Sequence, residues 1–159
     1  MKRGNMKTRT IGLTLGMLFV GLAMCAAQNP TLGTWKLNEA KSKIAPGASK
    51  NLMVKYEAAG DSIKGTIDGV DEKGQPTHNE WTGKFDGKDY PVTGDPTQDT
   101  RAIKQVDDHH YQLTVKKGGK VTITGKAVIA ADGKSRTVTV SGMDSMGMKI
   151  EGVSVYDKQ

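Results

Sequence analysis

The sequence predicts an all-β protein, an antiparallel up-and-down meander barrel of eight to ten strands with a short helical turn after the first strand. Three observations favour this fold class. From Lys50 onward, apolar and polar residues alternate with the period of two that is typical of half-buried strands. Turn pairs such as Gly60-Asp61 and Asp132-Gly133 interrupt the alternation at short intervals. Outside residues 1–27, only 38–43 predict a helix, and a long one-sided sheet tends to close and remove its edges. An open sandwich is the alternative.

Residues 1–27 are expected to be a signal peptide. A basic start precedes an uncharged, mostly apolar run over 11–24, which is too short to span a membrane. Cys25-Ala26-Ala27 supplies the small residues of a cleavage site, so we expect cleavage before Gln28. This predicts a periplasmic or extracellular protein with a single domain over 28–159 and no transmembrane span in the mature form. Lipidation at Cys25 is the less favoured alternative, because Met24 is not the small residue that a lipidation site needs.

The basic balance of the chain comes largely from this leader. Four of the 23 basic residues and none of the 17 acidic residues lie in 1–27, which leaves 19 basic residues against 17 acidic ones. The lysines are scattered among acidic residues and form no basic stripe, so nucleic-acid binding is not expected. Cys25 is the only cysteine, so the mature domain must be stabilised by its core rather than by disulfides.

The first predicted strand, Gly33–Leu37, contains one of the two tryptophans. Trp35 is the expected plug of the core, since an indole buries more apolar area than most side chains. Gly33 is expected to let another backbone approach the ring. Residues 38–43 can form one helical turn, which Pro46-Gly47 prevents from continuing.

The rest of the chain divides into strands joined by short turns. Asp86-Gly87 predicts a two-residue hairpin turn, because both central positions of that turn have positive φ. Pro91 cannot donate to a ladder, so its strand is expected at an edge or beside a bulge. Closure would bring the last strand, with Tyr156, beside the Trp35 strand. Strands are expected over 50–56, 63–67, 78–85, 88–93, 100–106, 111–115, 120–130, 136–140 and 148–156.

Several motifs give the chain a resemblance to a known family, namely GTWKLNEAKSK, PG, DGKDYPVTG and a terminal VYDK. The chain resembles the lipocalin-like (calycin) barrels and, more closely, small exported bacterial lipocalin-like proteins of undefined activity. The resemblance covers most of residues 33–158 and implies a cup for a small, mostly apolar ligand. It also implies a basic residue of the last strand packed over Trp35. Lys158 is nearest to that place, where the family carries an arginine.

Strand alternation defines a candidate interior of the barrel. Its side chains either line a site for one small ligand or simply fill the barrel. Both hypotheses stay open, because small residues such as Gly65, Gly83 and Gly125 lie on the same faces as large ones. The candidate ligand-binding residues are Tyr56, Ile67, Trp81, Phe85, Ile103, Leu113, Ile123 and Val138.

Arg101 and Arg136 are the only arginines after residue 27. Their parity matches that of Ile103 and Val138, so both are candidates for the interior. The chain is similar in general plan to fatty-acid-binding barrels, which use inward arginines to hold a carboxylate. The planar guanidinium suits that task better than lysine does, and the resemblance implies an anionic amphiphile as a candidate ligand. The alternative, which the sequence favours, places each arginine at a strand end with its guanidinium in water.

No metal site is expected. Asp107-Asp108-His109-His110 contains metal-ligand residue types, but neighbours in one turn rarely converge on an ion, so a solvated hairpin tip is the expected structure. Met143, Met146 and Met148 resemble the copper(I) sites of exported proteins, but their spacing also fits a loop followed by a strand.

Catalysis is not expected either, and no cofactor is implied. His78 and Glu80 face away from Trp81, and no serine elbow or HExxH motif occurs. The sequence therefore predicts a secreted barrel that binds a small hydrophobic or amphipathic ligand. The alternative is a filled structural barrel that contacts another envelope or extracellular protein.

Overall fold

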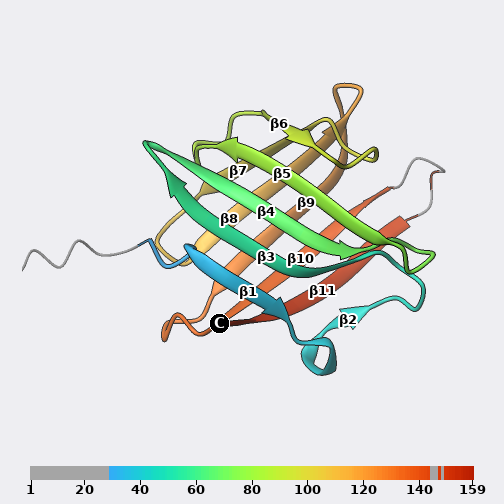
Figure 1. The fold of residues 1–159 in the computed structure, drawn as a ribbon, viewed down its shortest axis with the longest axis horizontal. Helices are drawn as coiled ribbons and strands as arrows, with labels where there is room; N and C mark the ends of the chain where they lie inside the picture. Colours follow the sequence, from blue (N-terminus) through green and yellow to red (C-terminus); the bar gives the residue numbers. More distant parts are fainter. Residues whose placement is uncertain (1–28, 144–146, 148) are drawn as a thin grey trace, which may run out of the picture.

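One antiparallel sheet closes on itself to form a barrel in the computed structural model, which describes residues 29–143, 147 and 149–159 (Figure 1). Consecutive long strands pair in chain order, and the last returns to pair with the first. The prediction of an all-β, antiparallel up-and-down meander barrel is confirmed. The strands are β1 (Gly33–Leu37), β2 (Lys43–Ile44), β3 (Lys50–Ala59), β4 (Ser62–Val70), β5 (Pro76–Gly83), β6 (Tyr90–Thr93), β7 (Thr100–Gln105), β8 (His110–Lys117), β9 (Lys120–Ile129), β10 (Ser135–Met143) and β11 (Lys149–Lys158).

Closure of the barrel holds the tryptophan strand on both edges. In the β1–β11 ladder, Trp35 lies opposite Lys158 and Leu37 lies opposite Tyr156. On its other edge β1 pairs with β3, where Trp35 lies opposite Val54. The predicted placement of the Tyr156 strand beside the Trp35 strand is therefore confirmed.

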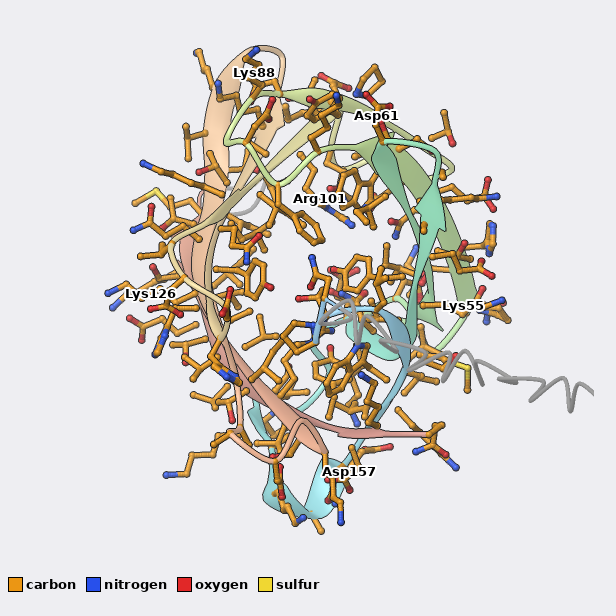
Figure 2. All side chains as sticks on the ribbon, turned by 90° about the vertical axis from the view of Figure 1, so that its left-hand side faces the viewer. Lys55, Asp61, Lys88, Arg101, Lys126 and Asp157 are labelled. Atoms are coloured by element: carbon orange, nitrogen blue, oxygen red, sulfur yellow. The ribbon has the colours of Figure 1, made fainter. Side chains whose placement is uncertain are left out.

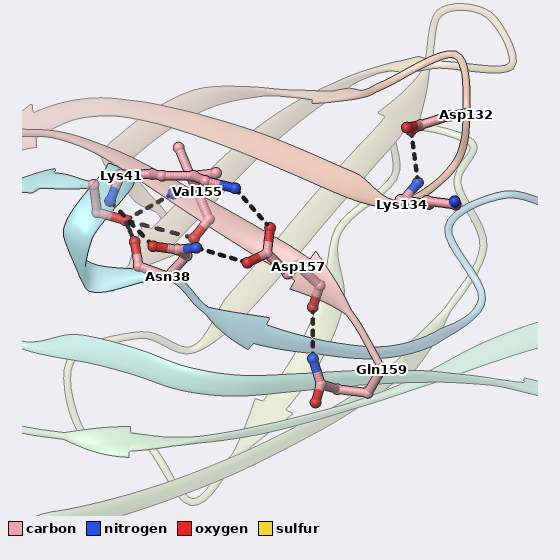
Figure 3. Close-up of polar contacts among 8 residues, drawn as sticks. Asn38, Lys41, Asp132, Lys134, Val155, Asp157 and Gln159 are labelled. Carbon is pink, nitrogen blue, oxygen red and sulfur yellow. Dashed lines mark hydrogen bonds and ion pairs between the residues drawn. The ribbon is translucent and has the colours of Figure 1, made fainter.

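The helical turn predicted at 38–43 is a 3-10 helix, η1 (Glu39–Lys41), between β1 and β2. Asn38 caps it with Oδ1, which accepts from Lys41 N at 3.2 Å. The Asn38 Nδ2 donates to Asp157 Oδ2 at 2.6 Å, and Lys41 Nζ lies 3.5 Å from the other carboxylate oxygen (Figure 3). Asp157 thus anchors the turn. β1, before the turn, and β2, after it, both pair with β11. Within the part of the chain that the structure describes, no helix is long and apolar enough to cross a membrane.

The connection between β5 and β6 corrects one prediction. β5 ends at Gly83 and β6 begins at Tyr90, so Asp86-Gly87 does not form a two-residue hairpin turn. The segment instead pairs with β7, where Gly87 N donates to Ile103 O at 2.9 Å. The Asp86 carboxylate accepts hydrogen bonds from Lys88 N and from the Tyr90 hydroxyl. These bonds stabilise a local turn within the longer connection between β5 and β6.

Apart from the two-residue β2, β6 is the most weakly paired strand of the sheet. It forms two residue pairs with β5 and two with β7. Pro91 has no N–H to donate. The prediction that its strand lies at an edge or beside a bulge is wrong, because β6 is paired on both sides within the closed barrel and neither ladder contains a bulge.

Gly65 on β4 gives a sharp test of the packing. A Cβ at this position would lie 3.0 Å from two atoms of the Trp81 indole, whose ring covers the glycine. Trp81 is only 2% exposed and cannot move outward without leaving the core. We expect Gly65→Ala to lower the free energy of unfolding by about 1–3 kcal/mol, measured by urea denaturation.

Gly152→Ala on β11 is the matched control, because the nearest atom to its added Cβ is 3.6 Å away. Its effect should stay within about 0.5 kcal/mol. Equal losses of unfolding free energy for the two variants would show that the packing of the Trp81 indole does not require a glycine at position 65.

Candidate functional site

One end of the barrel is plugged around Trp35. The ring is fully buried, and its Nε1 donates to Thr31 O at 2.8 Å. Lys158 Nζ lies 5.0 Å from the ring centroid and donates to Pro30 O at 3.0 Å. Gly33 has a φ of 115°, and a Cβ there would lie 3.0 Å from Lys158 Cε. The sequence suggested a neighbouring backbone as the reason for Gly33, but its close neighbour is this lysine side chain.

The interior opens toward the opposite end of the barrel. Along β9, the inward-facing residues pass from Ile129, which is 2% exposed, to a half-buried Ile123. Along β10, they pass from Arg136, which is 5% exposed, to half-buried Val138 and Val140. The barrel interior beyond the Trp35 plug is called the cup here, and its inward-facing apolar side chains are less buried toward the other end.

Arg101, the second residue of β7, points into this cup (Figure 2). It is 7% exposed, and only its Nη2 is hydrogen-bonded to described residues. That nitrogen donates to Gln98 Oε1 at 2.9 Å and to Asn79 Oδ1 at 3.3 Å. The Nε atom is buried and has no partner in the described part of the chain. The expectation that the Arg101 head lies in water is not met.

The charge of Arg101 is poorly compensated. No carboxylate within 29–143, 147 and 149–159 lies within 4.0 Å of a nitrogen of either arginine head. Burial lowers the pKa of Arg101, while Tyr56 and Asp95 act in the opposite direction. Arginine remains charged even so, and a buried charge without a charged partner is costly. An oxyanion placed here would supply the missing countercharge.

Arg136 is also inside the barrel but in different surroundings. Its Cζ lies 5.2 Å from the Trp35 ring centroid, 5.3 Å from that of Tyr56 and 4.9 Å from that of Tyr156. Three aromatic faces stabilise a buried guanidinium through cation–π attraction. Arg136 thus belongs to the plugged end, and the expectation that its head lies in water is not met.

An aromatic cluster lies in the core and contacts Arg136 through Tyr56. Tyr56, Trp81 and Phe85 lie with ring centroids 6.1–6.3 Å apart, and Phe85 lies 5.4 Å from Tyr111. The Trp81 Nε1 is buried without a described partner. Phe85 lies beyond the end of β5 rather than within the strand predicted there, but it still packs against the core. The cluster gives the cup a largely aromatic floor.

The other predicted interior residues also lie in or beside the core. Ile67 and Ile103 are buried, and Leu113 and Val138 are half-buried against the core, whereas Ile123 is half-buried nearer the open end. Sequence reasoning missed Asn79 and Gln98, which are 4% and 8% exposed. Asn79 has the parity of Trp81, which was a usable signal, whereas Gln98 lies in a turn-rich segment without periodicity.

Most of the other candidate residues are exposed or lie outside the described residues, whereas His109 is half-buried. At the hairpin tip, Asp107 Oδ1 accepts from the backbone nitrogens of His109 and His110, each at 2.9 Å, as expected of a solvated turn. Met143 is 62% exposed, whereas Met146 and Met148 lie outside the described residues.

His78 lies on the outer wall, as its parity predicted. Its Nδ1 is 2.7 Å from Asp68 Oδ1, and this hydrogen bond raises the pKa of the exposed imidazole. A pKa that is higher in the folded state gives a contribution to stability that is complete below about pH 6.5. That contribution is lost as the pH rises through the folded-state pKa.

We expect Asp68→Asn to lower the NMR titration midpoint of His78, because the substitution removes the carboxylate that stabilises the protonated imidazole. An unchanged midpoint would contradict the pairing.

The outer wall also carries an open hollow of about 380 Å³ over β10, β11 and β2. By strand parity most of its lining faces outward, so it is separate from the cup. Its lining consists of Lys43, Thr139, Val140, Ser141, Glu151, Gly152 and Val153.

The fold and this interior define a closed antiparallel meander barrel with one open end. No family model matches the chain, and no curated protein matches it. Among solved structures, the chain is similar to a redesigned β-barrel, mFAP1, bound to DFHBI, with 14% identity and a TM-score of 0.42 over 81% of this chain and 95% of that one. It is also similar to lobster apocrustacyanin A1, with 12% identity and a TM-score of 0.42, over 84% of this chain and 63% of that one. At these values neither likeness assigns a family or a ligand.

Proposed function

We propose that the barrel binds one small amphipathic molecule and performs no chemistry on it. The apolar part of the ligand lies among Ile123, Val138 and Val140 at the open end, and an anionic head reaches Arg101. The observation that carries this proposal is the buried Arg101 head, which has no carboxylate within ion-pair distance among the described residues.

Arg101 suits this role better than Arg136. The Nε atoms of both arginines are buried without a partner among the described residues, so a ligand oxyanion could add a charge-assisted hydrogen bond at either head. The difference lies in what already surrounds each guanidinium. Arg136 is already covered by three rings at the plugged end. The head group is therefore expected in the middle of the barrel, with the aromatic cluster beyond it.

Decanoate and decan-1-ol test the proposal, because they share a chain and differ in charge. Native mass spectrometry of the purified protein and thermal unfolding with each compound should show binding and a raised melting temperature. Decanoate is expected to bind the more tightly, by about tenfold or more. Failure of both compounds to bind, with no co-purified small molecule, would contradict the proposal.

A second function, a protein-interaction barrel without a small ligand, is supported by the hollow on the outer wall. Its outward-facing lining combines apolar Val153 with polar Ser141, Lys43 and Glu151, as a small contact surface does. This function predicts that Ser141→Arg abolishes capture of a partner without changing the melting temperature. Retained capture would remove the hollow as the contact site.

We also propose that the protein is exported, in the manner of small bacterial envelope or secreted proteins. The support is the basic start of the chain followed by the uncharged run at 11–24 and small residues before Gln28. Intact mass measurement of the protein from a bacterial envelope fraction should give a chain beginning at Gln28. A diacylglyceryl group on Cys25 would contradict that cleavage site.

A further inference from the structure

The loop between β6 and β7 sends one side chain into the barrel beside Arg101. Gln98 is 8% exposed, and its Oε1 accepts from Arg101 Nη2 at 2.9 Å. Its Nε2 donates to the Asp95 carboxylate. The loop is held against β5, because a Cβ on Gly94 would lie 3.3 Å from Asn79 Cα.

Asp95 fixes which way the Gln98 amide points. The Asp95 carboxylate accepts hydrogen bonds only, and it is itself held by Thr97 N at 2.9 Å and Thr97 Oγ1 at 2.6 Å. The amide must therefore turn its NH₂ toward Asp95 and its oxygen toward Arg101. Asn79 adds a second neutral oxygen to the same Arg101 nitrogen.

The arrangement keeps the Asp95 carboxylate apart from the Arg101 guanidinium, with the Gln98 amide hydrogen-bonded between them. Two amide oxygens orient Arg101 by dipoles and leave its charge for another partner. A glutamate at position 98 would reach the same nitrogen and pair with the charge directly. Because position 98 carries an amide and the carboxylate lies at position 95, the Arg101 guanidinium keeps its charge for a ligand.

We propose that Gln98, oriented by Asp95, is the specificity-determining residue of the cup: it holds Arg101 in place without neutralising it, so that the barrel selects ligands with an oxyanion head. This inference rests on the proposed ligand-binding function. It adds a separate element to that function, since a barrel can bind amphiphiles without this arrangement.

The double variant D95N/Q98E tests the inference, because it keeps the net charge and moves the carboxylate next to Arg101. The amide that replaces the carboxylate at position 95 can still donate a hydrogen bond to the side chain at position 98. We expect decanoate affinity to fall at least about tenfold, while decan-1-ol affinity stays unchanged. The melting temperature of the ligand-free protein should rise, because the buried guanidinium gains a charged partner.

Gln112→Glu is the matched control, since Gln112 is exposed and lies on β8. This variant introduces a carboxylate on the outside and should bind decanoate like the wild type. Wild-type decanoate affinity in D95N/Q98E would overturn the role of Gln98 and leave the binding function intact. If neither decanoate nor decan-1-ol bound to the wild type, both the role of Gln98 and the proposed binding function would be overturned.

Discussion

Replacing Trp35 by alanine should lower the free energy of unfolding by about 3–5 kcal/mol, the largest effect expected of a single substitution in this chain. The ring is fully buried and joins three parts of the plug: the lead-in through Thr31, β11 through Lys158, and the guanidinium of Arg136. Loss of the ring leaves a cavity and also exposes two cations that it covers. Chemical denaturation followed by circular dichroism measures the effect.

Trp35→Phe provides the control, because it keeps an aromatic face and removes the Nε1 donor together with a smaller part of the ring volume. Its cost should be clearly smaller than that of alanine. If the alanine variant lost less than about 1 kcal/mol, the plug would not depend on the indole, and the closed end would need another explanation.

Arg101→Met should weaken decanoate binding by about tenfold to a hundredfold while leaving decan-1-ol binding within about twofold. A charged group that accepts a hydrogen bond loses about 1.5–3 kcal/mol when its charged donor is removed. The same variant should raise the melting temperature by a few degrees, because a buried charge with little compensation is replaced by an apolar side chain. Thermal unfolding and calorimetric titration measure the two effects.

Arg136→Met is the informative comparison, because the two arginines are buried to a similar degree. It should lower the melting temperature, since Arg136 loses contacts with three aromatic rings. A fall in stability for Arg101→Met would assign Arg101 to the structure rather than to the ligand.

The barrel was predictable because its signals are local. Alternation assigns each strand, and short turns leave antiparallel pairing of neighbours as the simplest arrangement. The Asp86-Gly87 prediction was wrong because the turn preference of these residues was overridden by pairing of the segment with β7. Local preference identified a turn there but not the strands that it joins.

The interior was predictable only in part. Parity indicated that Arg101 and Arg136 could face inward, but the expectation of heads in water followed from placing each arginine at a strand end, from which its head can reach solvent. The rings that cover Arg136 come from β1, β3 and β11, and no local pattern brings these strands together at one residue. Gln98 was missed because the turn-rich segment around it gives no face to assign.

A crystal structure of the protein with decanoate tests the central claim most directly. The carboxylate is expected inside the barrel with an oxygen about 2.7–2.9 Å from an Arg101 guanidinium nitrogen, and with the chain directed toward Ile123 at the open end. Decanoate found only in the outer hollow over β10 and β11, with Arg101 unchanged and out of contact, would contradict it.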